Sequence, residues 1–323
     1  MLRKTLYFLI FLCSANKVFG QQDPQFSQYM FNNLYLTPAY AGVDGVTRLT
    51  AFHRSQWLGY QSSFDDGGAP TTQMVSFNTP IFKLKSGFGG YVMNDNLGPQ
   101  NNLEIQASYA YHLGIKESKL SFGVRLGMYS QTLDYDKYRA INPDDPLLTE
   151  GGSTKAGKES QIKPDMAFGV FFRSEKYYAG LGFNHLLKSE FDFGLSQRNA
   201  LENHLNATAG YFYEVNFDLS IQFAALVKSD FNKTMVDASV LAYLKDTMWG
   251  GLSFRPSEAA TLLLGYSFLK DKSLKLGYSL DYVIQDQDAK AATSHELMLS
   301  YELPVNPGSG KKVIRTPRYR HSN

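Results

Sequence analysis

Long stretches in which apolar and polar side chains alternate constrain this chain more than any other feature of its sequence. From Leu103 to Leu113, apolar residues such as Ile105 alternate with residues such as Glu104 and Gln106. A period of two indicates a β-strand with two unlike faces. The same pattern recurs in residues 120–129, 219–228, 236–245 and 274–285. These stretches match the ~9–11 residues of a tilted transmembrane strand and exceed the ~5–6 residues of a globular strand.

Weaker alternation over the rest of the chain brings the expected total to about 14 strands, an even number, as in bacterial single-chain barrels. These further strands are expected at residues 46–54, 72–79, 86–93, 165–173, 177–185, 204–213, 248–255, 261–268 and 295–303.

The links between the expected strands alternate between short and long. Short links are expected at residues 114–118, 174–176, 214–216, 246–247 and 269–273, longer ones at 57–70, 94–102, 133–164 and 186–203, and one of intermediate length at 286–294. Residues 229–233 and 256–260 interrupt this alternation with short links on the long side. Membrane barrels have short turns at one end and longer loops at the other. The sequence therefore predicts an all-β fold, an antiparallel up-and-down transmembrane barrel preceded by a non-barrel segment.

The two faces of each strand suit different surroundings. One face is Leu, Ile, Val, Phe, Tyr and Ala, which suits lipid, and the other is rich in Ser, Gly, Gln and charged residues, which suits a polar lumen. Charges of both signs on the polar face favour paired networks and a filled interior over an open pore. A soluble barrel or sandwich with the apolar face inside is the alternative, because periodicity does not say which face points inward.

The first 20 residues have the pattern of a secretory signal peptide. Arg3 and Lys4 precede a short apolar run, and the small residue Gly20 ends the segment. Cys13 is the single cysteine and lies within this segment, so the mature chain is expected to have no disulfide and no thiolate metal site. Export combined with a barrel predicts location in a bacterial outer membrane, with both termini on the periplasmic, short-turn side.

Two segments lie outside the strand pattern and complete the expected division of the chain. Residues 1–20 are the signal peptide, 21–45 a plug or docking segment, 46–303 the barrel, and 304–323 a basic periplasmic tail. The candidate contact residues of the tail are Lys311, Lys312, Arg315, Arg318 and Arg320. A tail with no carboxylate could bind nucleic acid by composition, but for an exported chain a partner or anionic lipid is the expected contact.

The residues give no support for catalysis. The six histidines show no metal-binding spacing, and no serine lies in a recognisable nucleophile turn. We therefore expect a chain that is not an enzyme, with no catalytic, metal or cofactor-binding residues and no cofactor.

A string near the N-terminus resembles a known family. Residues 25–32 read QFSQYMFN and residues 37–42 read TPAYAG, and residues 54–57 read RSQW. This combination is similar to the PorP/SprF family of the Bacteroidetes type IX secretion system and its gliding machinery. The resemblance is dense over roughly the first 130 residues. The basic tail is the part of the chain that departs from it.

The resemblance implies a non-enzymatic outer-membrane component that links periplasmic ring subunits of the secretion motor to export or anchoring of a surface adhesin. Its expected partners are these ring subunits, the adhesin and outer-membrane lipid, with no nucleic acid. The candidate partner or plug residues are Phe26, Tyr29, Phe31, Tyr35, Pro38, Tyr40, Arg54 and Trp57. The alternative is a small-molecule porin or a channel for hydrophobic substrates.

Overall fold

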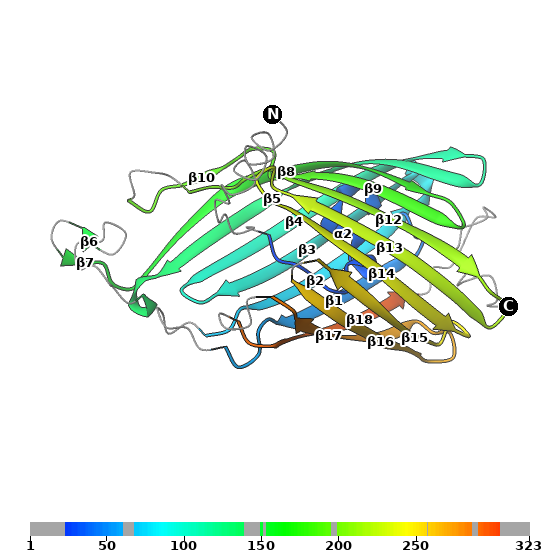
Figure 1. Ribbon diagram of the computed structural model, residues 1–323. Helices are drawn as coiled ribbons and strands as arrows, with labels where there is room; N and C mark the ends of the chain where they lie inside the picture. Colours follow the sequence, from blue (N-terminus) through cyan, green and yellow to red (C-terminus); the bar gives the residue numbers. More distant parts are fainter. Residues whose placement is uncertain are drawn as a thin grey trace, which may run out of the picture.

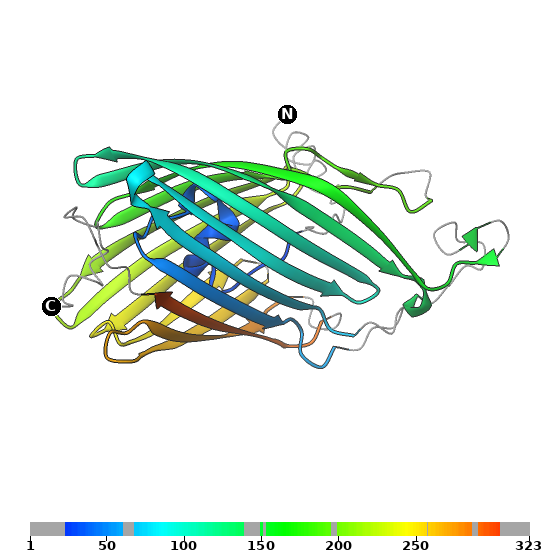
Figure 2. The same ribbon diagram turned by 180° about the vertical axis from the view of Figure 1, so that it is seen from behind.

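The protein forms a closed antiparallel β-barrel of 14 strands, shown from two sides in Figures 1 and 2. This computed structural model describes residues 23–60, 68–138, 149–150, 153–194, 199–256, 258–285 and 290–303. Neighbouring strands in the chain pair with each other, and the last strand pairs with the first. No helix among these residues is long and apolar enough to cross a bilayer.

The barrel strands are β1 (Thr47–Ser55), β2 (Thr71–Ile81), β3 (Ser86–Leu97), β4 (Gln100–Ile115), β5 (Ser118–Asp134), β8 (Lys158–Arg173), β9 (Tyr177–Asn184), β12 (His204–Glu214), β13 (Leu219–Ser229), β14 (Thr234–Leu244), β15 (Met248–Arg255), β16 (Ala259–Phe268), β17 (Leu274–Val283) and β18 (Thr293–Leu303). Each expected strand overlaps one of these, so the predicted fold class is confirmed. A short 3₁₀ helix, η3 (Phe82–Leu84), lies between β2 and β3, and another, η4 (Tyr135–Lys137), follows β5.

The two faces of the strands are oriented as the alternation predicts for a membrane barrel. Along β4, Ile105 and Tyr109 point outward and are exposed, whereas Glu104 and Gln106 point into the barrel and are buried. This orientation rules out the soluble alternative, in which the apolar face would be inside.

The expected loop asymmetry is present, with two corrections. Residues 94–102 are not a loop, because β3 continues to Leu97, β4 begins at Gln100, and only Gly98 and Pro99 turn between them. The polar residues there pair in a ladder, which overrides their low strand propensity. The long loops also contain two small hairpins, β6–β7 (Thr149–Glu150 and Ser153–Thr154) and β10–β11 (Glu190–Phe191 and Asn199–Ala200), which the sequence analysis did not predict.

Strand β8 begins earlier than expected and includes Pro164. Pairing with β9 starts only at Phe168, so the preceding part of β8 has a neighbouring barrel strand on one side only, which is β5. The carbonyl of Pro164 accepts a hydrogen bond from Ser189 on the open side, where the missing N–H would also point. A proline is tolerated in a strand at such an edge.

The N-terminal segment lies inside the barrel, where its short helices appear in blue in Figures 1 and 2. We call residues 23–45 the luminal segment. It contains η1 (Tyr29–Phe31), α2 (Asn33–Leu36) and η2 (Pro38–Tyr40). Asp23 contacts His185, just after β9 at the long-loop end, and Asp44 contacts Arg48 at the start of β1, at the short-turn end.

The described ends of the chain therefore lie at opposite ends of the barrel. Asp23 is at the long-loop end, and Leu303, the last residue of β18, is at the short-turn end. This differs from the expectation that both termini face the same side, although residues 1–22 and 304–323 lie outside the described part. No local pattern in residues 23–45 indicates the direction in which the luminal segment runs.

Candidate functional site

The candidate site is the lumen, which the luminal segment fills. A barrel of about eight strands is just filled by its own side chains, and wider barrels leave an interior space. In this 14-stranded barrel the space is occupied by aromatic residues of the segment, which pack on the wall. Phe26 lies against Phe52, and Tyr35 against Tyr91, with ring centroids 5.4 and 5.6 Å apart. The segment and the apolar residues of the wall thus form one core inside the barrel.

A row of small residues on the wall admits the backbone of the segment. Gly87, Ala110, Gly123, Gly169 and Gly182 are paired across β3, β4, β5, β8 and β9 at one level of the barrel. We call them the glycine row. A Cβ at any of its four glycines would overlap atoms of the luminal segment between residues 36 and 42.

The local sequence fits this close approach. Thr37 is extended (φ −148°, ψ 129°), as expected for a residue before proline, and Pro38 starts η2 at the position where its missing N–H costs least. The Thr37 hydroxyl donates to the carbonyl of Leu181, at 2.9 Å. The segment is therefore held by specific contacts as well as by shape.

Charged side chains of the wall satisfy the irregular backbone of the segment. Arg125 donates to the carbonyl of Tyr35 at 2.9 Å, and Lys228 to the carbonyls of Asp23 and Pro24 at 3.1 Å each. Buried backbone groups outside helices and sheets need such partners. Because these partners come from the wall, the segment and the barrel are stabilised together.

A buried ion cluster fixes the part of the segment nearest the long-loop end. The Glu296 carboxylate accepts hydrogen bonds from the backbone N–H groups of Ser27 and Gln28, at 2.8 and 2.9 Å. Arg54 donates to Ser27 Oγ at 2.8 Å and to Asp281 at 2.7 Å, and its Nη1 lies 3.4 Å from Glu296. One arginine thus contacts two buried carboxylates that also bind the segment.

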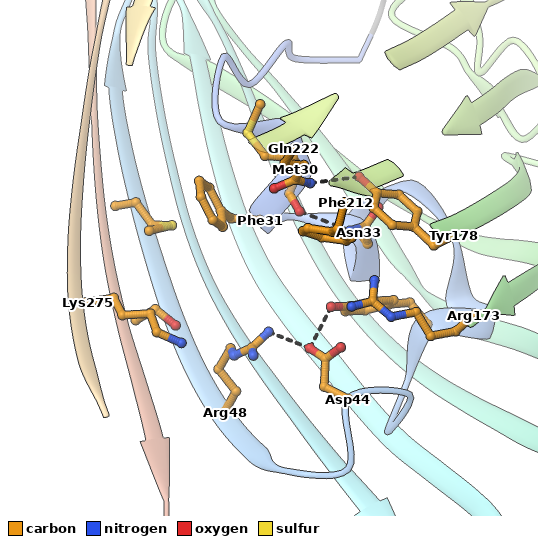
Figure 3. A pocket seen from close by; sticks show the side chains of 13 residues that line it. Met30, Phe31, Asn33, Asp44, Arg48, Arg173, Tyr178, Phe212, Gln222 and Lys275 are labelled. Carbon is orange, nitrogen blue, oxygen red and sulfur yellow. Dashed lines mark hydrogen bonds and ion pairs between the residues drawn. The ribbon is translucent and has the colours of Figure 1, made fainter. Parts of the chain in front are cut away.

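The short-turn end opens into a small mouth, drawn in Figure 3. Arg48 and Arg173 lie beside Asp44, and Lys275 lies across the mouth from it. Phe31 is one of the apolar residues that line the cavity. The cavity measures about 60 Å³, room for a few water molecules. Burial alone would raise the pKa of Asp44, but the guanidinium groups of Arg48 and Arg173 hold that pKa below its ordinary value. The carboxylate therefore stays charged and closes the segment against the first strand.

The structure brings most of the predicted plug residues together in the lumen. Phe26, Tyr29, Tyr35, Pro38 and Tyr40 are buried and Phe31 is half-buried. Arg54, which was expected at the end of the first strand, points inward and joins the ion cluster. Trp57 does not reach the lumen; it lies beyond β1 at the long-loop end, where its ring contacts Tyr60 and Lys290. The tail residues 311–320 lie outside the described part of the chain.

The glycine row was not predicted from the sequence. Its members stand on the polar faces of their strands, so the alternation gave them no special role. The sequence does contain a signal for this row. Glycines on the lumen-facing side of neighbouring strands occur at positions that strand pairing brings to one level.

Fold and lumen define the chain as an outer-membrane β-barrel, and comparisons with known proteins support this class. The Ralstonia pickettii toluene transporter TbuX has a similar fold, with a TM-score of 0.51 and 10% identity over 84% of this chain and 93% of that one. The deltaS2S3 mutant of TodX, a monoaromatic hydrocarbon channel, also has a TM-score of 0.51, at 10% identity over 83% and 93%. At such identity the likeness concerns the fold alone.

The family is established by sequence. Residues 18–301 match the model of the PorP/SprF family, described as a type IX secretion system membrane protein. The chain belongs to this family, as the N-terminal string indicated. No functionally curated protein matches the sequence.

Proposed function

We propose that this protein is a closed, non-enzymatic barrel that connects the periplasmic ring of a type IX secretion motor to export or anchoring of a surface adhesin. Family membership supports a place in the secretion machinery. The closed state is supported by the luminal segment, whose residues are mostly buried from one end of the barrel to the other.

The filled lumen argues against the alternative of a small-molecule channel. Ligand pockets usually have volumes of about 300–1,000 Å³. The cavity at the mouth is about 60 Å³ and is lined by paired charges. An apolar substrate would meet Asp44, Arg48 and Arg173 there, and would have to displace the segment to pass.

The connection to the ring is proposed to involve the short-turn end and the basic tail. With short turns facing the periplasm, Asp44, Arg48 and the end of β18 face the ring, and the tail follows directly from β18. Lys311, Lys312, Arg315, Arg318 and Arg320 would attract an acidic surface of a ring subunit.

Replacing these five basic residues by glutamine is expected to reduce the ring subunits that copurify with the tagged barrel from outer membranes. The loss should be several-fold at physiological salt, because the contact is electrostatic and screened. Mass spectrometry of the copurified proteins measures it. The matched control replaces Lys116, Lys176 and Lys272, which lie in short turns at the same end, by glutamine. Absence of every secretion component from the wild-type sample would contradict the proposed function.

The proposed orientation can be tested by cysteine labelling, because the mature chain is expected to lack cysteine. Asn232→Cys places a thiol in an exposed link at the long-loop end, and Glu117→Cys places one in an exposed short turn. On intact cells a membrane-impermeant maleimide should label Asn232→Cys and leave Glu117→Cys unmodified, whereas both should react after lysis. The reverse pattern would place the long loops in the periplasm and contradict this orientation.

A further inference from the structure

A cluster of possible metal ligands lies where the luminal segment meets the wall at the long-loop end. Asp23, His185 and His204 are all buried, and one ligand atom from each lies within 4.8 Å of those of the other two. They come from three parts of the chain: the start of the luminal segment, the residue after β9 and the first residue of β12. Two imidazoles and one carboxylate form a common ligand set for zinc.

The histidines are held as metal-binding histidines usually are. In such sites one ring nitrogen binds the metal and the other is fixed by a carboxylate or a backbone carbonyl. His185 Nε2 lies 2.8 Å from Asp23, while its Nδ1 lies 3.2 Å from the Asp165 carboxylate. His204 Nδ1 lies 3.0 Å from the carbonyl oxygen of Glu202. That contact places the proton on Nδ1 and leaves the lone pair on Nε2 of His204. Nδ1 is also the nitrogen that lies 3.9 Å from Asp23 Oδ2, so the imidazole has to give up the Glu202 contact, or turn, to bind an ion beside Asp23.

Three atoms of the cluster lack a hydrogen-bond partner among the described residues. These are Oδ2 of Asp23, Nδ1 of His185 and Nε2 of His204, and all three are buried. A buried polar atom without a partner costs about 1–3 kcal/mol, and more if it is charged. A cation bound by the cluster would satisfy the Asp23 carboxylate.

We propose that Asp23, His185 and His204 bind a divalent transition-metal ion, for which zinc is the best match. Imidazole ligands disfavour calcium and magnesium, which prefer oxygen donors. Three protein ligands leave one position of a tetrahedral ion for a water molecule. The ion would fasten the start of the luminal segment to the wall between β9 and β12.

Lys228 is the group that competes with the ion. Its ammonium lies 3.6 Å from Asp23 Oδ2 and donates to two carbonyl groups of the luminal segment. An ammonium and a metal cation beside the same carboxylate repel each other. Lys228→Gln keeps a hydrogen-bond donor and removes the charge, so it should bind zinc more tightly, whereas loss of a ligand should weaken binding.

The test is titration of the mature full-length barrel with zinc chloride in detergent, without a polyhistidine tag and after treatment with a chelator. We expect about one zinc per chain by elemental analysis, and His204→Gln should lower the affinity at least tenfold, as losses around metal sites commonly do by about 10–100-fold. The matched control is His112→Gln, which changes a buried histidine bonded to Ser121 at the other end of the barrel. Lys228→Gln should show the opposite change.

Cobalt provides a measurement on the unaltered chain, so the proposal stays testable if a variant fails to fold. Cobalt(II) in this site should show the strong visible absorption of a four-coordinate ion with nitrogen ligands. Absence of stoichiometric zinc, unchanged zinc affinity in a folded His204→Gln, or a weak six-coordinate cobalt spectrum would each overturn the proposal. None of these measurements needs a secretion partner, so they are independent of the proposed function.

Discussion

Gly182→Leu is expected to turn a closed barrel into a conducting one. The side chain would project from the glycine row into the backbone of the luminal segment at Leu36 and Thr37. The wall of paired strands has no room to retreat, and overpacking of this kind costs about 1–3 kcal/mol even where neighbours adjust. The segment is the part able to move, since it is held by side-chain contacts and not by a strand ladder. Planar-bilayer recording should show steady conductance for the variant and none for the wild type.

Gly114→Leu is the control for this experiment. Gly114 lies in β4, at the short-turn end, where a Cβ would meet nothing within 4 Å. The same side chain there should leave the barrel closed. Steady conductance of the wild-type protein would count against the closed barrel and in favour of the channel alternative. A closed Gly182→Leu barrel would show that the segment adjusts around the new side chain.

The barrel could be predicted from the sequence because each strand carries its own evidence. The alternation in residues 103–113 requires no knowledge of the rest of the chain, and the direction of its faces follows once lipid is outside. The ends of the strands were harder to predict, because Asn96 and Asn101 have low strand propensity and yet pair with each other across β3 and β4. Local patterns do not contain that information.

The filling of the lumen could be predicted only in part. The aromatic residues at 26–40 marked the segment as something that packs, and the mixed charges of the wall favoured a filled interior. The wall residues that bind the segment could not be predicted, because they lie far away in the sequence. Ser27 and Asp281, which form a hydrogen bond, are 254 positions apart. His185 and His204 likewise show no motif spacing, yet strand pairing and the luminal segment bring them to one point. Local sequence patterns do not predict a site whose residues come together only when the barrel closes.

Arg54→Met is expected to cause a large loss of stability. Arg54 is the cation shared by Asp281 and Glu296, and the side chains of all three are almost completely buried. Removing one partner of a buried ion pair leaves the other charge uncompensated and costs about 3–5 kcal/mol. The same carboxylates bind Ser27 and Gln28, so the luminal segment should loosen as well. The midpoint of urea unfolding, followed by the gel mobility of the folded and unfolded barrel, measures the loss.

A double variant separates the effect of uncompensated charge from the effect of lost packing. If uncompensated charge is the cause, Arg54→Met combined with Asp281→Asn should be more stable than Arg54→Met alone, because one orphaned carboxylate has been removed. Lys188→Met offers the comparison at the surface, where the lysine pairs with Glu202 and the two side chains are 57% and 42% exposed. An exposed ion pair contributes about 0–1 kcal/mol, so this variant should unfold near the wild-type midpoint. Equal losses in Arg54→Met and Lys188→Met, or no recovery in the double variant, would show that Arg54 acts through its bulk and not through its charge.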